Sequence, residues 1–538
     1  MNFLGQQSPN ILWISFEDTS PRFGCYGDSL ARTPNTDRLA SEGMLFRSAF
    51  STAGVCSPSR SAVITGMYAP SIGAHHHRTS HPEVHTPDLP TPYEVVPPAY
   101  VKLVPEYLRT KGYYCTNNYK TDYQFQSPFT AWDENGEMAH WRNREPEQPF
   151  FSVFNLFETH ESGMWREYDI LKTDPDKVTL PLYLPNTEKS RKALALHYDN
   201  LEAADHHLGD LLRQLEEDGL AENTIVFIWS DHGEGIPRSK RWLYDSGLRV
   251  PLIVRWPGNV ESGTVSDQLV SMIDLGPTVL SLIGLPIPVQ MQGQPFIGPK
   301  TIPREYIYAS RDRHDESYDM VRAVRDGKFK YIRNYHPEKP YFDWVPYGHQ
   351  HAIFQEMWRL HAAGKLEGPQ RTWMVDGRPP EELYDCVNDP FEICNLAEQT
   401  DHSNVLERMR RELDDWRRRI GDMGDIPEWQ LVRRMWPDGV QPATAPVQFV
   451  LIDEEHPGLE AITGGGSYQA PALLMLYCAT QGASIAYRAE AEGAIPNWRL
   501  YTSPFQLPVG NSKIRVKAVR IGYAPSEEIE AVFTVEPL

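Results

Sequence analysis

The chain has 538 residues, more than one ordinary domain requires, so we expect at least two domains. Apolar residues make up 41% and aromatic residues 11%, which excludes disorder over most of the chain. The formal net charge of −20 excludes a general binder of nucleic acids or anionic membranes but permits one local basic pocket.

The first predicted element is a buried strand over residues 10–16, a largely apolar run that ends at Glu17 and Asp18. Helix-like and strand-like segments then alternate. Further strands are predicted over 113–117, 149–157, 224–230 and 250–255, and helices over 101–111 and 193–218. This order predicts an α/β fold with a mostly parallel sheet sandwiched by helices.

The composition changes after this region. Residues 336–381 are rich in Pro, Trp, Tyr and His and predict long loops, and residues 405–420 predict a charged amphipathic helix. Residues 437–446 predict a linker. Short strand-like runs in the tail predict a small β-sandwich. We therefore expect an α/β domain, a smaller α+β subdomain with long loops and a C-terminal β-sandwich, over 1–335, 336–436 and 447–538.

The sequence contains few signals of cellular location or of disulfide bonding. No stretch is long and apolar enough to cross a membrane. The first ten residues have neither a basic nor an apolar segment, so we expect no signal peptide, and the protein is cytoplasmic or a mature form whose signal has been removed. Six cysteines are too few for a disulfide scaffold and show no zinc spacing, although Cys386 and Cys394 are near enough in sequence to pair.

The most specific motif is Cys56-Ser-Pro-Ser-Arg60, followed by Thr65-Gly66. With the segments 33–39 and 382–390, it resembles the signature of the type I sulfatases, within the alkaline-phosphatase-like superfamily. In those enzymes a maturation enzyme oxidises the cysteine of C-x-P-x-R to formylglycine. The resemblance therefore implies an alkaline-phosphatase-like fold, a formylglycine derived from Cys56 and a formylglycine-generating enzyme as partner.

The residue types suit this chemistry. Hydrated formylglycine carries two hydroxyls, of which one attacks sulfur and the other expels sulfate on deprotonation. Pro58 favours the first turn of a helix, so residue 56 is expected at a helix N-terminus, where backbone N–H groups bind anions. Arg60 is expected to fork onto the sulfate and to hold residue 56 in place.

The resemblance also implies a calcium site. The family binds calcium through an acidic pair after the first strand and Asp-Asn or Asp-His after a later one, which here are Glu17-Asp18 and Asp231-His232, with residue 56 beside them. Calcium prefers carboxylate oxygens and would polarise the sulfate. Glu17 departs from the usual Asp by one methylene and is the least secure ligand.

Further catalytic residues follow from the same resemblance. Lys120 matches the lysine of a G-K-x-H motif whose histidine is replaced by Asp122, and Lys240 matches a second sulfate-binding lysine. His160 follows the strand at 149–157 and is expected to protonate the leaving alcohol as a group that titrates near neutrality. Asp122 or another histidine would activate the hydroxyl.

Candidate substrate-binding residues are histidines and arginines near these motifs: His75, His77, Arg78, Arg142 and Arg241. For the tract around His75, substrate binding is the favoured interpretation, a polar loop is the main alternative, and adventitious binding of a transition metal is a minor one.

The resemblance and the many Trp and Tyr residues indicate a sulfatase acting on a sulfated oligo- or polysaccharide, such as ulvan, carrageenan, fucan or a glycosaminoglycan. The tail resembles the sandwich appended to some polysaccharide-degrading enzymes, and some features resemble the sulfamidase branch, so N-sulfates stay open. A bacterial protein of this kind is expected in the periplasm or medium. The alternatives are a phosphonate or phosphate ester hydrolase of the same superfamily and an inactive carbohydrate-binding relic.

Overall fold

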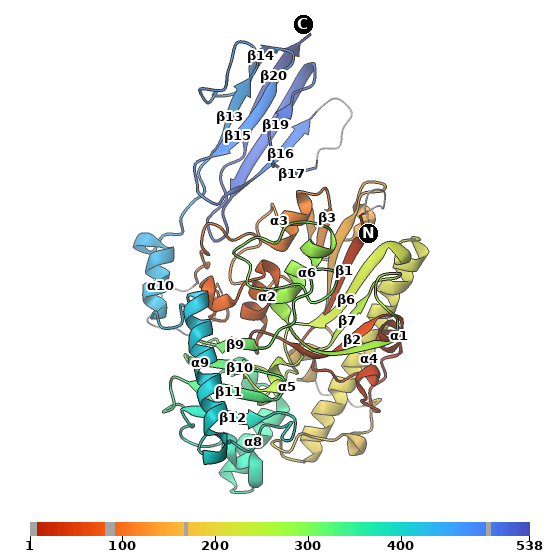
Figure 1. Cartoon of the computed structure of the whole chain (residues 1–538), viewed down its shortest axis with the longest axis vertical. Coiled ribbons are helices and arrows are strands. Elements are labelled where there is room, and N and C mark those ends of the chain that lie inside the picture. Colours follow the sequence, from red (N-terminus) through yellow and green to blue (C-terminus); the bar gives the residue numbers. More distant parts are fainter. Residues whose placement is uncertain (1–7, 81–91, 166–169, 491–496, 538) are drawn as a thin grey trace.

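The computed structural model describes residues 8–80, 92–165, 170–490 and 497–537 (Figure 1). Most of the first ten residues, on which the expectation about a signal peptide rests, lie outside these ranges. All six cysteines lie within them and are free, so Cys386 and Cys394 do not pair. None of the described helices combines the length and the apolar character that crossing a bilayer requires.

The centre of the molecule is an eight-stranded sheet with the order β4-β3-β5-β1-β6-β7-β2-β8. Its strands are β1 Asn10–Phe16, β2 Met44–Phe50, β3 Tyr114–Asn118, β4 Glu134–Asn135, β5 Phe150–Leu156, β6 Thr224–Ser230, β7 Leu252–Arg255 and β8 Thr264–Ser271. All neighbouring pairs are parallel except those that β7 forms with β6 and β2. The mostly parallel sheet is therefore confirmed, with one reversed strand.

Helices cover both faces of this sheet, which explains why β1 is apolar along its whole length. Ile11 and Trp13 pack on one side with α2, α3 and α6. Leu12 and Ile14 pack on the other side with α1 and α4. The ranges of these helices are α1 Pro34–Glu42, α2 Cys56–Thr65, α3 Val104–Arg109, α4 Glu188–Glu217 and α6 Leu275–Leu282.

A second, antiparallel sheet has the order β12-β11-β10-β9 and is covered by α9 (Ser403–Ile420). Its strands are β9 Ile307–Arg311, β10 Val321–Arg325, β11 Phe329–Asn334 and β12 Glu381–Asp385. Three of these strands precede the expected boundary at residue 335, so one sheet crosses it. The helix predicted over 405–420 is confirmed, because Met409, Leu413 and Trp416 form its buried face.

The expectation of long loops over 336–381 is wrong in part. This segment contains α7 (Pro346–His349) and α8 (Ala352–Ala362). In α8, Ile353, Phe354, Met357 and Leu360 are buried. Their spacing is that of an amphipathic helix, a signal that the high Pro and aromatic content of the segment conceals. The other short helices are α5 (Asp245–Leu248) and α10 (Glu428–Met435).

The C-terminal part is the expected β-sandwich, which extends from the top of the main body in Figure 1. One sheet contains β13 Val447–Ile452, β15 Leu473–Cys478 and β18 Phe505–Gln506. The other contains β14 Gly466–Gln469, β20 Ile529–Glu536, β19 Gly510–Val519, β16 Ser484–Glu490 and β17 Arg499–Leu500. Hydrogen bonds join it to the α3 region: Lys102 Nζ donates to the Gly482 carbonyl at 2.7 Å, and Ser484 Oγ donates to Glu106 at 2.6 Å.

Candidate active site

Three neighbouring parallel strands bring acidic and histidine side chains to one edge of the main sheet. β1 is followed by Glu17 and Asp18, β6 by Asp231 and His232, and β5 by the segment that carries His160. Because β1 lies between β5 and β6, the carboxyl ends of all three strands meet there. All five side chains are buried.

Four side chains form a group that can hold a metal ion, which we call the strand-end cluster: Asp18, Cys56, Asp231 and His232. Their ligand atoms all lie within 4.8 Å of one another. His232 Nε2 lies 3.1 Å from Asp18 Oδ1 and 3.3 Å from Cys56 Sγ. His232 Nδ1 lies 2.9 Å from the carbonyl oxygen of Gly233, which can only accept, so Nε2 faces the cluster.

Glu17 lies beside this group without being one of its four members, and its expected role as a metal ligand stays a prediction. Its carboxylate accepts hydrogen bonds from Arg60 and, at 2.5 Å, from Lys120 Nζ. Burial raises the pKa of Glu17, although Arg60 opposes the shift. The carboxylate of Glu17 therefore links Arg60 and Lys120 next to the cluster.

Cys56 reaches the cluster as the first residue of α2, as its motif predicts. Pro58 lies in the first turn, where its missing N–H costs no hydrogen bond. Arg60 lies one turn further along α2. Its Nε donates to Asp231 Oδ2 at 3.1 Å, and its Nη1 donates to Asn155 Oδ1 at 2.8 Å. Arg60 therefore holds the strand ends and the N-terminus of α2 in one arrangement.

Two buried lysines supply positive charge beside the cluster. Lys240 Nζ lies 2.7 Å from Asp18 Oδ2 and 2.9 Å from Glu161 Oε1. Lys120 Nζ contacts Glu17 and lies 3.6 Å from Asp122. Burial disfavours the charged amines, but the surrounding anionic groups raise the pKa of both lysines above the ordinary value. Both ammonium groups therefore stay charged.

Asp122 lies next to the start of α2. Its Oδ1 accepts a hydrogen bond of 3.0 Å from Ser57 Oγ, and its backbone has a left-handed φ of 48°. Burial opposes ionisation, but Lys120, His77 and Arg78 lower the pKa of Asp122 below its ordinary value. An ionised carboxylate thus stands beside residue 56, in the position of the histidine that the resemblance implies.

His160 lies at the same edge, with its ring stacked on Phe157 at 4.5 Å and Nδ1 2.8 Å from Ser162 Oγ. Burial lowers the pKa of His160 to about 3. The positive charges of Lys240 and Lys120 also lower this pKa, whereas the nearby Asp18 carboxylate raises it. The imidazole is therefore neutral, whereas the sequence predicts a group that titrates near neutrality. The residue is placed as expected, but its surroundings shift its titration.

Three of the expected substrate-binding residues lie near this site. His77 Nδ1 lies 3.1 Å from Asp315 Oδ1, and the guanidinium of Arg78 lies 4.4 Å from the ring centre of Tyr347. Arg241 donates two hydrogen bonds to Glu161, of 3.0 and 2.7 Å.

The structure places Arg142 away from the site, whereas the role of His75 stays a prediction. His75 lies in a continuous run of buried residues, and its ring lies 4.3 Å from that of His76 and has no hydrogen-bond partner among the described residues. Arg142 Nε donates to Asp218 Oδ2 at 2.8 Å, just after α4 ends and shortly before β6 begins. Arg142 therefore lies toward the opposite edge of the sheet from the strand-end cluster.

Three further residues belong to this site that the sequence analysis does not identify: Glu161, Asp315 and Tyr347. Glu161 accepts from Lys240 and Arg241, and its backbone N–H donates to Asp18 Oδ2 at 2.7 Å. Its position directly after His160 is a signal that identifies it. Asp315 and Tyr347 come from the second sheet region and from α7, and no motif marks either residue.

Known proteins resemble this chain in sequence over most of its length. The family model named Sulfatase matches residues 9–145 and 137–285, and the model named N-sulphoglucosamine sulphohydrolase, C-terminal, matches residues 233–343. An ulvan-active sulfatase of Formosa agariphila is 41% identical over 97% of this chain and 91% of its own length. The N-sulphoglucosamine sulphohydrolase of Homo sapiens is 26% identical over 76% of this chain and 89% of its own length.

Solved structures share the fold. A protein in complex with its substrate D-glucosamine-2-N,6-O-disulfate has a TM-score of 0.55 at 18% identity, covering 78% of this chain and 99% of that one. The phosphonate monoester hydrolase of Agrobacterium radiobacter has a TM-score of 0.56 at 15% identity, covering 77% of this chain and 96% of that one. At these identities the likeness concerns the fold alone. The family match, together with the relative that is similar over nearly the whole chain, shows that this protein belongs to the sulfatase family.

Proposed function

We propose that this protein releases sulfate from a sulfated carbohydrate, with residue 56 as a formylglycine nucleophile and Ca²⁺ at the strand-end cluster. The observation that carries the proposal is the convergence of Asp18, Cys56, Asp231 and His232 within 4.8 Å, beside buried, charged Lys120 and Lys240. Fixed positive charges of this kind stabilise an anionic transition state.

The donor set fits a hard divalent cation. Asp18 and Asp231 offer carboxylate oxygens, the ligands that calcium prefers, and His232 directs Nε2 at the same point. The Cys56 sulfur is a soft donor, and conversion to formylglycine would replace it with oxygen. When bound, the ion would act as a Lewis acid on the sulfate oxygens.

The chain's own groups prepare residue 56 for its role. The modified residue would supply a pair of hydroxyls at the N-terminus of α2, where backbone N–H groups face an incoming anion. Asp122, held by Ser57, is ionised and able to accept a hydroxyl proton. Lys120 and Lys240 provide positive charge for the sulfate, and Arg60 fixes Asp231 relative to the helix.

His160 is proposed to protonate the leaving alcohol. Its imidazole is neutral in the structure because burial and the two lysines disfavour the charged form. A bound sulfate ester would add negative charge beside the ring, which raises the pKa of the imidazole and favours the protonated donor. Ser162 holds Nδ1, so Nε2 is the atom left to act on the substrate.

The names of two relatives indicate which substrates to test first. The relative that is 41% identical is named for activity on ulvan, and its similarity extends over 97% of this chain, the β-sandwich included. Ulvan oligosaccharides are therefore the first substrates to test. N-sulfated glucosamine is the second, because of the relative named for N-sulphoglucosamine. We infer from a polymeric substrate that the protein acts in the periplasm or medium, and we propose a formylglycine-generating enzyme as its maturation partner.

The test compares ester classes. The protein, produced with a formylglycine-generating enzyme, is given matched aryl sulfate, aryl phosphate and aryl phosphonate esters, together with the ulvan and glucosamine compounds. Faster release of sulfate than of phosphate is the expected result. Preference for the phosphonate ester would identify a hydrolase of the other class, and carbohydrate binding without any hydrolysis would identify a relic.

A further inference from the structure

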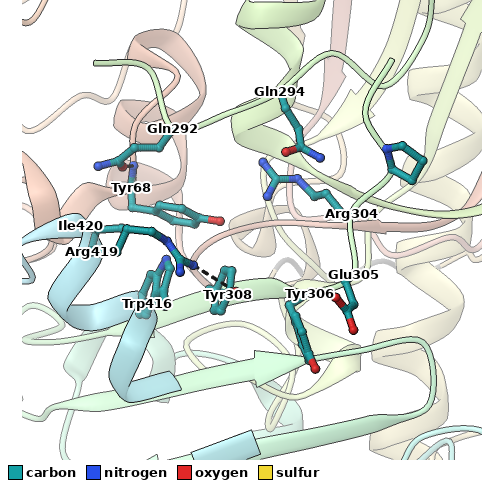
Figure 2. Close-up of a pocket in the computed structure, with 11 residues that line it drawn as sticks. Tyr68, Gln292, Gln294, Arg304, Glu305, Tyr306, Tyr308, Trp416, Arg419 and Ile420 are labelled. Atoms are coloured by element: carbon teal, nitrogen blue, oxygen red, sulfur yellow. Dashed lines mark hydrogen bonds between the residues drawn. The ribbon is translucent and has the colours of Figure 1, made fainter. Parts of the chain in front are cut away.

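A second pocket lies at the other end of α2 from Cys56. It has a volume of about 350 Å³ and lies between α9, the segment that leads into β9 and the chain after α2 (Figure 2). α2 has ten residues and spans about 15 Å, so the pocket is separate from the strand-end cluster. A volume in this range accommodates a small ligand, such as one or two sugar units.

One buried donor at this pocket lacks a partner. Nε1 of Trp416 has no hydrogen-bond partner among the described residues, although the side chain is only 1% exposed. Figure 2 shows the Tyr68 hydroxyl pointing toward Arg304 across the pocket. A buried donor without a partner costs free energy, which a ligand with oxygen acceptors would recover.

The lining carries charges of both signs, from Arg304, Glu305 and Arg419, and among the two arginines Arg419 is the less tightly paired. Arg304 is held by Asp274 through two hydrogen bonds. Arg419 has one hydrogen bond among the described residues, at 3.3 Å to Tyr308 Oη, and Glu412 lies 3.6 Å away. The Arg419 side chain is 58% exposed, so its guanidinium can receive an anionic group from solvent.

Amide and aromatic groups complete a surface that suits a sugar. Gln292 and Gln294 line the pocket, and the amide oxygen of Gln292 accepts from the Tyr68 backbone N–H at 2.7 Å, which fixes its orientation. Tyr306 is partly exposed at the rim. Amides pair with hydroxyls, an exposed ring packs on the apolar face of a pyranose, and a guanidinium pairs with a sulfate or carboxylate.

We propose that this pocket binds an anionic sugar unit of the polysaccharide substrate without hydrolysing it. The inference rests on the proposed function. Such a second contact raises the effective concentration of the polymer at the strand-end cluster. A disaccharide is too short to span the length of α2 and gains nothing from the pocket.

The test is a charge reversal with a matched control. Arg419→Glu places a carboxylate at the pocket, whereas Arg418→Glu makes the same change one position earlier in α9, on a side chain that is 74% exposed and does not line the pocket. Both are introduced into the Cys56→Ser protein, and ulvan binding is measured by affinity electrophoresis. Both are also introduced into the active enzyme, and sulfate release is compared between ulvan and an ulvan disaccharide.

Arg419→Glu is expected to weaken ulvan binding about tenfold and to slow release from ulvan, with release from the disaccharide unchanged. Arg418→Glu is expected to match the parent. Equal ulvan binding by the two variants, an equal loss on polymer and disaccharide, or no ulvan binding by the Cys56→Ser protein would overturn the inference. Failure of the proposed function is a different result, namely no sulfate release by the parent from any substrate.

Discussion

At the scale of single residues, the site consists of buried charges that stabilise one another. Asp18 lies between Lys240 and His232, and Asp231 lies between Arg60 and His232. Removing one partner of such a pair leaves an uncompensated buried charge, which costs about 3–5 kcal/mol. Substitutions here therefore affect folding as well as catalysis, and tests of mechanism need substrate comparisons beside simple losses of rate.

The role of His160 can be tested by the leaving group. His160→Ala should lower kcat/KM on a carbohydrate sulfate by about 10²–10⁴-fold, because an alcohol is a poor leaving group that needs a proton. An activated aryl sulfate should lose much less, since its phenolate leaves without help. An equal loss on both substrates would contradict the proposed proton transfer and indicate a positioning role.

Metal dependence tests the strand-end cluster. Exhaustive chelation should abolish most sulfate release, and added Ca²⁺ should restore it, because Asp18 and Asp231 offer the oxygen ligands that calcium prefers. Metal content measured on the same samples should change in parallel with the rate. Full activity in protein shown to be free of metal would refute the assignment.

The sequence predicts the residues of this site where motifs or strand ends mark them. Cys56, Asp18 and Asp231 are identified in this way, whereas Glu161 is missed although it directly follows His160. Asp315 and Tyr347 could not, because they reach the site through the packing of distant segments. The lowered pKa of His160 could not be predicted from the sequence either, because it results from burial of the side chain.

At the scale of elements, charge links α9 to the second sheet. Arg410 on α9 donates two hydrogen bonds of 2.8 Å to Glu381 on β12, and Tyr331 on β11 donates another of 2.5 Å to the same carboxylate. The pKa of Glu381 is lowered from an ordinary value of 4.5 to about 2, mainly because of the hydrogen bonds from Arg410. The folded state therefore binds this proton more weakly than the unfolded chain does.

Because the pKa is lowered on folding, the stabilisation is present above pH 4.5 and is lost as pH falls toward 2. Glu381→Gln should lower Tm at pH 7, and the difference from the parent should shrink over this window. Glu407→Gln, an exposed position on α9, should leave Tm unchanged at each pH. A Tm difference for Glu381→Gln that persists unchanged at pH 2 would contradict the charge-based explanation.

Helices and strands with a regular hydrophobic pattern could be predicted, whereas the pairing and direction of individual strands could not. β1 and β6 have the predicted bounds because both are buried apolar runs. The reversed direction of β7 and the extension of the second sheet across residue 335 depend on long-range pairing, which no local pattern encodes. α8 was hidden by the composition around it rather than by its own periodicity.

At the scale of the whole molecule, the β-sandwich is fixed to the catalytic part by close backbone contact. Gly482 has a left-handed φ of +79°, and a Cβ at this position would lie 2.2 Å from the Ala99 carbonyl oxygen. Gly522 makes a similar approach to Val95. The predicted linker over 437–446 therefore leads into a docked domain.

Gly482→Ala tests this docking. It should lower Tm by several degrees, because the new methyl group must displace the Ala99 backbone. Gly464→Ala is the matched control: its φ of +83° brings the same backbone strain, but no atom lies within 4 Å of a new Cβ. Equal losses for the two variants would show that the contact with Ala99 contributes nothing to stability.

The most direct test of the central claim is sulfate release from defined ulvan oligosaccharides by the parent and by Cys56→Ser, with conversion of Cys56 verified by peptide mass. We expect release by the converted parent and none by Cys56→Ser, because serine cannot become the aldehyde that expels sulfate. Near-normal release by Cys56→Ser would contradict the mechanism. Silence of the fully converted parent on sulfated carbohydrates would contradict the proposed function.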